Sequence, residues 1–247
     1  MQQERDIWDS NAARSYDTPG TGMFAPEVLD PTVRRLAELA AGGRALEFAI
    51  GTGRVAVPLV QRGVSVTGIE LSRPMIDQLR TKMDESTLPV VHGDMTSAVA
   101  PGSYRLVYLV YNTISNVLTQ EQQVQCFGNA ARHLTAGGRF VVELWVPELR
   151  KLTPTQQAVV FASEPGYIGV DTYDTLNQQV VSHHFRFDES GNARLFRSPH
   201  RYVWPAELDL MAHIAGFALE SRDADWNGTE FTAESRSHVS VYRLERE

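Results

Sequence analysis

The first residues whose types and spacing could do chemistry are two glycines at a strand-to-helix junction. Gly51-Thr-Gly53 follows the apolar run 45–50 and precedes a predicted helix over 55–61. Because glycine has no side chain, a ligand can approach the backbone there, and free N–H groups at a helix start can hold a carboxylate. Through Ala56 the same turn also satisfies the dinucleotide fingerprint G-x-G-x-x-G/A, and a turn without a ligand is the simpler alternative.

Acidic residues end the next two predicted strands. Glu70 stands 17 residues after Gly53, where a carboxylate can accept hydrogen bonds from both hydroxyls of a ribose. Asp94, followed by Met95, can accept from the amine on an adenine edge. The alternatives are a solvated carboxylate for Glu70 and a helix N-cap for Asp94. Because the carboxyl ends of neighbouring parallel strands meet at one edge of the sheet, the three strand ends together predict an adenosine site.

Strands and helices alternate through the first half of the chain, as in a doubly wound parallel sheet. The predicted strands are 45–50, 64–70, a third ending at 92–94, 104–111 and 140–145, and helices are predicted up to 42 and over 55–61, 72–84 and 119–134. Sheets of this kind bind ligands outside the carboxyl ends of their strands. The first half of the chain is therefore a predicted binding scaffold.

After Pro147 the pattern changes to β-rich runs separated by turn residues. The turns are predicted at 164–166, 174–177 and 188–192, which makes 156–204 an antiparallel meander. A helix over 205–214 and strands at 218–222 and 238–244 complete the chain. We expect the meander to lie over the ligand end of the sheet.

The stretch 47–145 resembles a class I S-adenosylmethionine-dependent methyltransferase of the small-molecule type. Glu47-Phe-Ala-Ile-Gly-Thr-Gly53 is similar to that family's first motif, E/D-x-G-x-G-x-G, and later motifs are matched by Glu70-Leu-Ser, Gly93-Asp-Met and Leu134-Thr-Ala-Gly-Gly-Arg-Phe140. The resemblance implies an α/β fold, a Rossmann-like doubly wound sheet of seven strands with the last antiparallel, and the meander inserted after strand five. It implies four segments: an N-terminal helical lid (1–42), a cofactor-binding core (43–147), an inserted β cover (148–204) and a C-terminal part completing the core (205–247).

The same resemblance assigns S-adenosyl-L-methionine as the cofactor and places residues around it. Ala49, Gly51 and Gly53 would line the methionine portion, Glu70 the ribose, Leu71, Asp94 and Met95 the adenine, and Tyr16 and Tyr111 the methionine end and the transferred methyl group. Ala49 departs from the family, which usually has glycine there. We expect alanine to adopt an ordinary backbone conformation at this position and to direct its methyl group toward the ligand.

The candidates for an acceptor pocket lie at strand ends and in the meander: Asn112, Trp145, His200 and Tyr202. Period-2 alternation places Phe196, Ser198, His200, Tyr202 and Trp204 on one face of a strand. That stripe, like Trp145, could instead belong to a core or to a dimer contact. His183 is expected to be a core histidine. The spacing of the histidines predicts no metal site, and no catalytic residue is assigned.

Composition narrows the class of partner. With 23 Lys and Arg against 30 Asp and Glu, the formal charge of −7 argues against nucleic acid and anionic membranes. The single cysteine, Cys126, allows no intrachain disulfide. The first ten residues contain no apolar signal core, and no run approaches about 18 apolar residues. We therefore expect a cytoplasmic protein with a small-molecule acceptor, and the edges of the meander would suit a homodimer.

The functional hypothesis is in-line transfer of a methyl group to a nitrogen or oxygen atom of a small molecule. Alignment of the reactants supplies most of the acceleration in such a reaction, and a base matters for a hydroxyl acceptor more than for a neutral amine. The alternatives are a protein or RNA methyltransferase, a non-catalytic protein that binds S-adenosylmethionine, and an NAD-dependent oxidoreductase.

Overall fold

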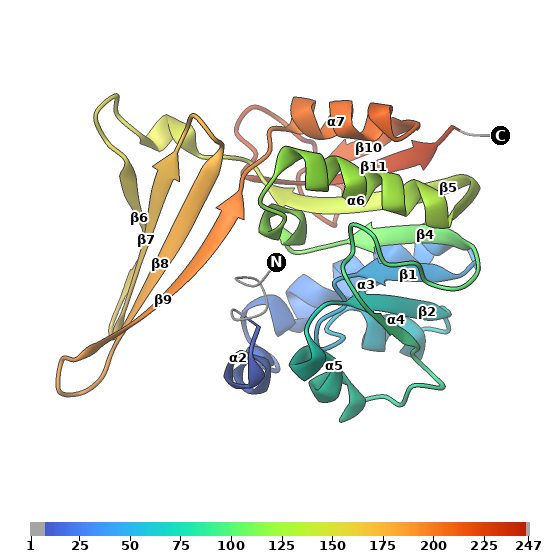
Figure 1. Cartoon of the computed structure of the whole chain (residues 1–247), viewed down its shortest axis with the longest axis horizontal. Coiled ribbons are helices and arrows are strands. Elements are labelled where there is room, and N and C mark those ends of the chain that lie inside the picture. Colours follow the sequence, from blue (N-terminus) through green and yellow to red (C-terminus); the bar gives the residue numbers. More distant parts are fainter. Residues whose placement is uncertain (1–7, 246–247) are drawn as a thin grey trace.

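The main sheet has seven strands in the order β10-β11-β5-β4-β1-β2-β3 in the computed structural model, which describes residues 8–245 (Figure 1). Its strands are β1 (Ala45–Phe48), β2 (Val66–Glu70), β3 (Val90–His92), β4 (Tyr104–Leu109), β5 (Leu134–Trp145), β10 (Phe217–Asp223) and β11 (Ser237–Leu244). Strands β1 to β5 pair in parallel, and β11 lies antiparallel between β5 and β10. The predicted doubly wound α/β sheet with an antiparallel last strand is confirmed.

Helices cover both faces of this sheet, because its strands are apolar on both sides. They are α2 (Ser10–Tyr16), α3 (Pro26–Ala40), α4 (Ala56–Gln61), α5 (Arg73–Arg80), α6 (Gln120–His133) and α7 (Pro205–Ile214), with short 3₁₀ turns η1 (Gly22–Phe24), η2 (Thr113–Asn116) and η3 (Leu149–Lys151). Phe127 of α6 and Met211 of α7 pack in one apolar core, and Leu36 of α3 and Leu59 of α4 pack in a second. Within residues 8–245, no helix combines the length and the apolar content needed to cross a membrane.

Two predicted boundaries are wrong by four residues or more. The helix predicted over 72–84 ends at Arg80, because the Thr81 hydroxyl donates to the Gln78 carbonyl and the Asp84 carboxylate accepts from the Thr87 N–H, so side chains compete with the helical pattern. Strand β5 begins at Leu134 and includes the glycine pair predicted as a turn before it. Residues 1–7 of the expected lid lie outside the described residues.

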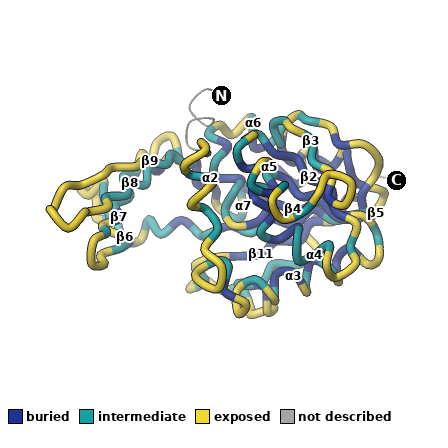
Figure 2. Tube along the Cα trace, turned by 90° about the horizontal axis from the view of Figure 1, so that it is seen from below, coloured by how far each residue is buried: buried dark blue, intermediate teal, exposed yellow. Residues whose placement is uncertain are grey.

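A second, antiparallel sheet follows β5 and extends away from the main body (Figure 1). We call it the cover; it consists of β6 (Ala158–Glu164), β7 (Tyr167–Asp174), β8 (Gln179–Phe187) and β9 (Ala193–Arg201), paired in chain order. This confirms the predicted meander and its three turns. Most of its residues are half-buried or exposed, whereas the main sheet is buried (Figure 2), so the cover has little apolar core of its own.

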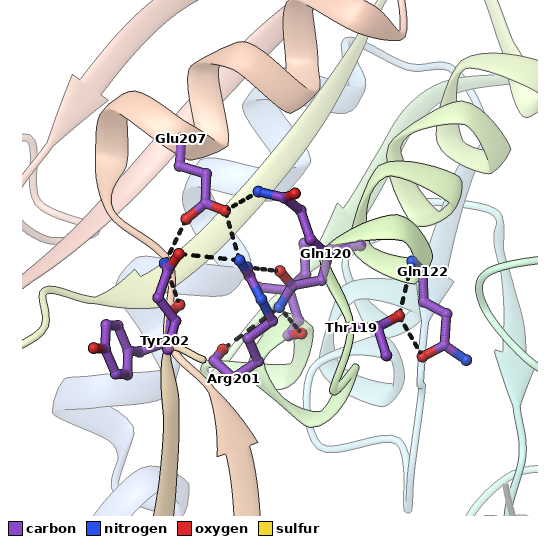
Figure 3. A network of polar contacts seen from close by, with 9 residues as sticks. Thr119, Gln120, Gln122, Arg201, Tyr202 and Glu207 are labelled. Atoms are coloured by element: carbon purple, nitrogen blue, oxygen red, sulfur yellow. Dashed lines mark hydrogen bonds and ion pairs between the residues drawn. The ribbon is translucent and has the colours of Figure 1, made fainter. Parts of the chain in front are cut away.

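The cover joins the main body through a buried ion pair at its base (Figure 3). Arg201, at the end of β9, is 5% exposed, and its guanidinium donates to Glu207 of α7 at 2.7 Å, to Gln123 of α6 at 2.6 Å and to Gln178 at 3.2 Å. Glu207 also accepts from the amides of Gln120 and Gln178, each at 2.7 Å. Burial alone would raise the pKa of Glu207, but these hydrogen bonds lower it by more, so the pKa lies below its usual value. The network therefore fixes the cover to two helices of the core.

Removing the carboxylate from this network should destabilise the protein strongly. Glu207→Ala leaves the Arg201 charge buried without a counterion, and breaking a buried pair in this way costs about 3 to 5 kcal/mol. Urea denaturation would measure the loss in the free energy of unfolding. Glu38→Ala, which removes a helical ion pair with Arg35 whose side chains are 39% and 55% exposed, should cost no more than about 1 kcal/mol. Equal losses in the two variants would contradict this account of the joint.

Candidate active site

Two cavities meet at the carboxyl ends of the parallel strands. The strand-end cavity lies over β1 to β3, and its lining includes Ala49, Ile69, Glu70, Leu71, Gly93, Asp94, Met95, Thr96, Val117 and Gln122. The cover cavity, of about 360 Å³, lies between the core and the cover, and its lining includes Tyr16, Tyr111, Asn112, Trp145, Glu148, Asp171, Tyr173, Val180, Ser182 and His200. Trp8, Thr113 and Asn116 line both. The two cavities therefore share walls, and a group bound in one lies next to a group bound in the other.

Glu70 connects the glycine turn to the start of α5. One carboxylate oxygen accepts from the Gly51 N–H at 2.8 Å and the other from the Ser72 N–H at 2.7 Å. Burial raises the pKa of Glu70, and these two backbone bonds oppose that rise. Glu70 is 7% exposed and lines the strand-end cavity, so the alternative of a solvated carboxylate does not describe it.

Asp94 has a local hydrogen-bonding role as well as a place at the cavity. Its Oδ1 accepts from the backbone N–H of Thr96 at 2.8 Å and from the Thr96 hydroxyl at 2.7 Å. This turn-capping contact is close to the N-cap alternative read from the sequence. Asp94, Leu71 and Met95, predicted as the adenine end of the site, nevertheless come together in the strand-end cavity.

Ala49 does not have the ordinary backbone conformation expected of it. Its φ is +51°, in the left-handed region, and the next residue, Ile50, donates its N–H to the Ile69 carbonyl at 3.1 Å. The chain thus turns toward β2 directly after β1, and alanine takes a conformation that suits glycine better. Glycine is usual in the family at this position because it adopts the left-handed backbone without strain, which the sequence analysis did not predict.

A buried carboxyl group lies beneath the glycine turn. Glu47 of β1 is 3% exposed and accepts from the Tyr108 hydroxyl at 2.9 Å. Burial raises the pKa of Glu47 to about 8, although the hydrogen bond from Tyr108 and the charge of Arg54 both act to lower it. Arg54 also lies with its guanidinium carbon 5.0 Å from the ring centre of Tyr111. The first motif therefore supplies both a turn and a buried acid.

The end of β4 is a strained turn that directs side chains into the cover cavity. Tyr111 and Asn112 both have left-handed backbones, with φ of +53° and +62°, a conformation that costs non-glycine residues energy and is common at functional sites. Hydrogen bonds hold the turn: the Tyr111 N–H donates to Glu143 at 2.6 Å, and Asn112 Oδ1 accepts from the Trp145 N–H at 2.7 Å.

Aromatic side chains from the N-terminal segment close the junction of the cavities. The rings of Trp8 and Tyr16 meet edge to face with centroids 5.6 Å apart, and burial raises the pKa of Tyr16 to about 12. Thr52 of the glycine turn donates to Asp17 at 2.6 Å, which fixes the end of α2 over that turn. The predicted lid residue Tyr16 thus lies at the site, in the cover cavity.

The cover contributes residues that the sequence reasoning missed. Asp171 of β7 and Ser182 of β8 face each other in register, and the serine hydroxyl donates to the carboxylate at 2.6 Å. Burial raises the pKa of Asp171, and the Ser182 bond opposes that rise. Alternation along β7 would have placed Asp171 with Tyr173, but only the pairing of β7 with β8 shows that both face the cavity.

Three of the four acceptor candidates line the cover cavity, and Tyr202 lies behind it. Asn112, Trp145 and His200 are among the lining residues. Strand β9 ends at Arg201, so the alternation that groups Tyr202 with His200 stops there. Tyr202 is 1% exposed, and its ring packs on Trp145 and Tyr173, with centroids 6.5 and 6.2 Å away.

Of the described residues, no three His, Cys, Asp or Glu side chains form a group that could hold a metal ion.

Gly51 and Gly53 have left-handed backbones, with φ of +57° and +80°. A Cβ added at Gly51 would come no closer than 3.9 Å to any other group, whereas at Gly53 it would meet Leu79 and Val57 at 3.0 Å. Gly51 therefore leaves open space beside the turn, and Gly53 is required by packing.

Comparisons with known proteins agree on one class of enzyme. A family model described as a methyltransferase domain matches residues 45–138. The cypemycin N-terminal methyltransferase of a Streptomyces species is 26% identical over 254 residues, covering 98% of both chains. The structure of the CcbJ methyltransferase from Streptomyces caelestis is 34% identical, covers 98% of both chains and superposes with a TM-score of 0.84. The amino pentose methyltransferase CalS10 from Micromonospora echinaspora, solved with S-adenosylmethionine bound, is 16% identical, covers 94% of both chains with a TM-score of 0.68, and shares the fold.

Replacing Ala49 with glycine should stabilise the protein. The left-handed conformation costs an L-residue about 1 to 2 kcal/mol, which glycine avoids. Glycine also gives the unfolded chain more conformational freedom, and this lowers the free energy of unfolding by about 0.5 to 1 kcal/mol. We expect Ala49→Gly to raise the free energy of unfolding by about 0.5 to 1 kcal/mol in urea denaturation. Ala37→Gly, inside α3, should lower it by about the same amount. A loss of stability in Ala49→Gly would contradict the strain assigned to this turn.

Proposed function

Because the chain belongs to the class I S-adenosylmethionine-dependent methyltransferases, we propose that it methylates an amine nitrogen of a small molecule. The observation that carries this proposal is Asp171, a half-buried carboxylate on the cover that faces a cavity adjoining the one lined by Glu70. Family membership gives no support to the NAD-dependent alternative. The relative named as an N-terminal methyltransferase supports nitrogen as the acceptor atom.

The residues of the strand-end cavity fit the cofactor. Gly51 leaves open space beside the turn, and the Glu70 carboxylate accepts from the backbone of Gly51, Ser72 and Leu71, which leaves it lone-pair capacity for a ribose hydroxyl. In this proposal Glu70 holds the ribose, Leu71, Asp94 and Met95 hold the adenine, and the methionine portion lies by Ala49, Gly51 and Gly53, next to Tyr16 and Tyr111.

The cover cavity suits a positively charged acceptor. Its described lining includes no Lys or Arg and two carboxylates, Asp171 and Glu148, the second of which also pairs with Arg236 at 3.5 Å. Five aromatic side chains line it as well: Trp8, Tyr16, Tyr111, Trp145 and Tyr173. Ring faces attract cations by about 0.5 to 2 kcal/mol, and a partly desolvated carboxylate binds an ammonium group more strongly than an exposed one does. An amine that enters as its ammonium form is thus favoured over a neutral alcohol.

The reaction depends mainly on alignment. When bound, the cofactor would supply a methyl group on a positively charged sulfur, and a neutral amine held in line with the C–S bond would take up that methyl group and leave the sulfur neutral. The ammonium must first lose a proton, and in this proposal Asp171, whose pKa burial raises, accepts it. Trp8 and Thr113 line both cavities and help to exclude water, which leaves proximity to supply up to about 7 to 11 kcal/mol of the barrier reduction.

The four segments have separate roles in this proposal. Of the predicted lid segment, residues 8–24 close the site and α3 packs in the core, 43–147 bind the cofactor, 148–204 select the acceptor, and 205–247 complete the core. The homodimer and the cytoplasmic location inferred from the sequence stay predictions.

The test of the function is a methyl-transfer assay with S-adenosylmethionine and a panel of small primary and secondary amines, each paired with the matching alcohol. Formation of the demethylated cofactor, measured by mass spectrometry, should accompany a singly methylated amine. Methylation of the alcohols alone would overturn the amine proposal.

Removing the Glu70 carboxylate should weaken cofactor binding. Charge-assisted hydrogen bonds contribute about 1.5 to 3 kcal/mol, so the affinity of Glu70→Ala for S-adenosylmethionine should fall about 10- to 150-fold in isothermal titration. Asp77→Ala, an exposed site on α5 paired with Arg73, serves as the control and should bind as the wild type does. If Glu70→Ala also binds normally, Glu70 does not hold the cofactor.

Neutralising Asp171 should impair acceptor recognition and leave cofactor affinity unchanged. For Asp171→Asn we expect kcat/KM for the amine to fall about 10-fold or more, because a charge-assisted hydrogen bond is replaced by a neutral one. Glu164→Gln, at the exposed far end of the same sheet, is the matched control. A variant Asp171→Asn with wild-type kcat/KM would show that the acceptor is not held by this carboxylate.

A further inference from the structure

A chain of four hydrogen bonds crosses the inner face of the cover and ends at the junction of the two cavities. Tyr167 Oη lies 2.7 Å from His184 Nδ1, and His184 Nε2 lies 3.3 Å from Ser198 Oγ. Ser198 Oγ lies 3.1 Å from His200 Nε2, and His200 Nδ1 lies 3.1 Å from Asn116 Oδ1. The chain thus joins β7, β8 and β9 to η2 of the core.

The orientation of the Asn116 carboxamide, with its Oδ1 toward His200, and the position of every proton in this chain are set together. A carboxamide oxygen only accepts, so His200 carries its hydrogen on Nδ1 and has a lone pair on Nε2. Ser198 therefore donates to His200 and accepts from the Nε2–H of His184, whose Nδ1 accepts from the Tyr167 hydroxyl. Every ring nitrogen and hydroxyl in the chain has a partner, in one consistent direction.

The chain requires neutral imidazoles, because a protonated ring has two donors and no acceptor. Burial lowers the pKa of His200 to about 4, with a smaller contribution from His184, and burial also lowers the pKa of His184. The charged groups near His184 are Asp171, which raises its pKa, and Arg186, which lowers it. Both rings are half-buried, where an unpaired ring nitrogen would be costly, so the hydrogen bonds account for their place on this face.

We infer that Tyr167, His184, Ser198 and His200 are positioning residues that hold the Asn116 carboxamide in one orientation where the cofactor and the acceptor meet. Asn116 lines both cavities. With one lone pair of Oδ1 used by His200, it retains a second lone pair and the Nδ2 hydrogens, to which no other residue of 8–245 is hydrogen-bonded in the structure. These groups can bind the acceptor beside the transferred methyl group.

This role rests on the proposed function, since the junction matters only if a methyl group is transferred there. It makes three residues of the cover that do not line the cavity, Tyr167, His184 and Ser198, contribute to the alignment of the reactants. Ser198, at the centre of the chain, is the decisive residue, because it alone among residues 8–245 is hydrogen-bonded to both histidines.

The experiment compares Ser198→Ala, which removes the hydroxyl, with Ser198→Thr, which keeps one. His183→Gln is the matched control: His183 is the neighbour of His184 on β8, points to the opposite face and bonds to Thr172 at 3.0 Å. With any acceptor that the wild type methylates, amine or alcohol, Ser198→Ala should lower kcat at least about tenfold. Affinity for S-adenosylmethionine should stay near the wild-type value, Ser198→Thr should recover most of kcat, and His183→Gln should match the wild type.

Nitrogen-15 NMR of histidine-labelled protein reads the proton positions directly and needs no acceptor. The wild type should show the Nε2–H tautomer for His184 and the Nδ1–H tautomer for His200, and both should lose their single tautomer in Ser198→Ala. The opposite tautomers in the wild type, or a wild-type kcat in Ser198→Ala, would overturn the inference. A failure to methylate amines counts against the proposed function instead, because the tautomers still decide whether the chain exists.

Discussion

The position of the cover depends on one buried charge. Taking a guanidinium out of water costs several kcal/mol unless a counterion and hydrogen bonds replace the solvent, and Arg201 obtains them only when Glu207 and Gln123 are brought to it from two helices of the core. The cover cannot be placed by apolar burial, since its strands are largely half-buried or exposed (Figure 2). The ion pair therefore holds the cover in position, whereas the two apolar cores hold the helices against the main sheet.

The shape of the cover cavity follows from this joint. Tyr202 comes directly after Arg201 and packs on Trp145 of the core and Tyr173 of the cover, so the same turn of chain that anchors the charge also sets the two walls against each other. Asp171 and Ser182 are held in the opposite wall by strand pairing. The joint between Arg201 and Glu207 thus sets the distance from Asp171 to the β4 turn.

The sequence predicted what depends on local pattern and missed what depends on contacts between distant segments. The strands, the glycine turn and Glu70 could be found because strand ends in a doubly wound sheet meet at one edge whatever the side chains are. Asp171 and Ser182 could not, because their place depends on the register between two strands of an insertion. The Arg201–Glu207 pair and the contribution of Trp8 could not be predicted either, because they too depend on contacts between distant segments. Ala49 was misjudged because its residue type says nothing of the backbone angle that the turn imposes.

A thin sheet also explains why the cover uses directional polar contacts near the site. In a packed core, side chains are fixed by neighbours on every side, whereas the inner face of the cover meets a cavity and lacks that support. Hydrogen bonds fix orientation without packing, and in a chain with every donor and acceptor used no group can turn unless all of them turn. The histidines of β8 and β9 are suited to it because a neutral imidazole donates at one nitrogen and accepts at the other. Polar residues on this face therefore substitute for an apolar core, and they leave the surface free to recognise a polar acceptor.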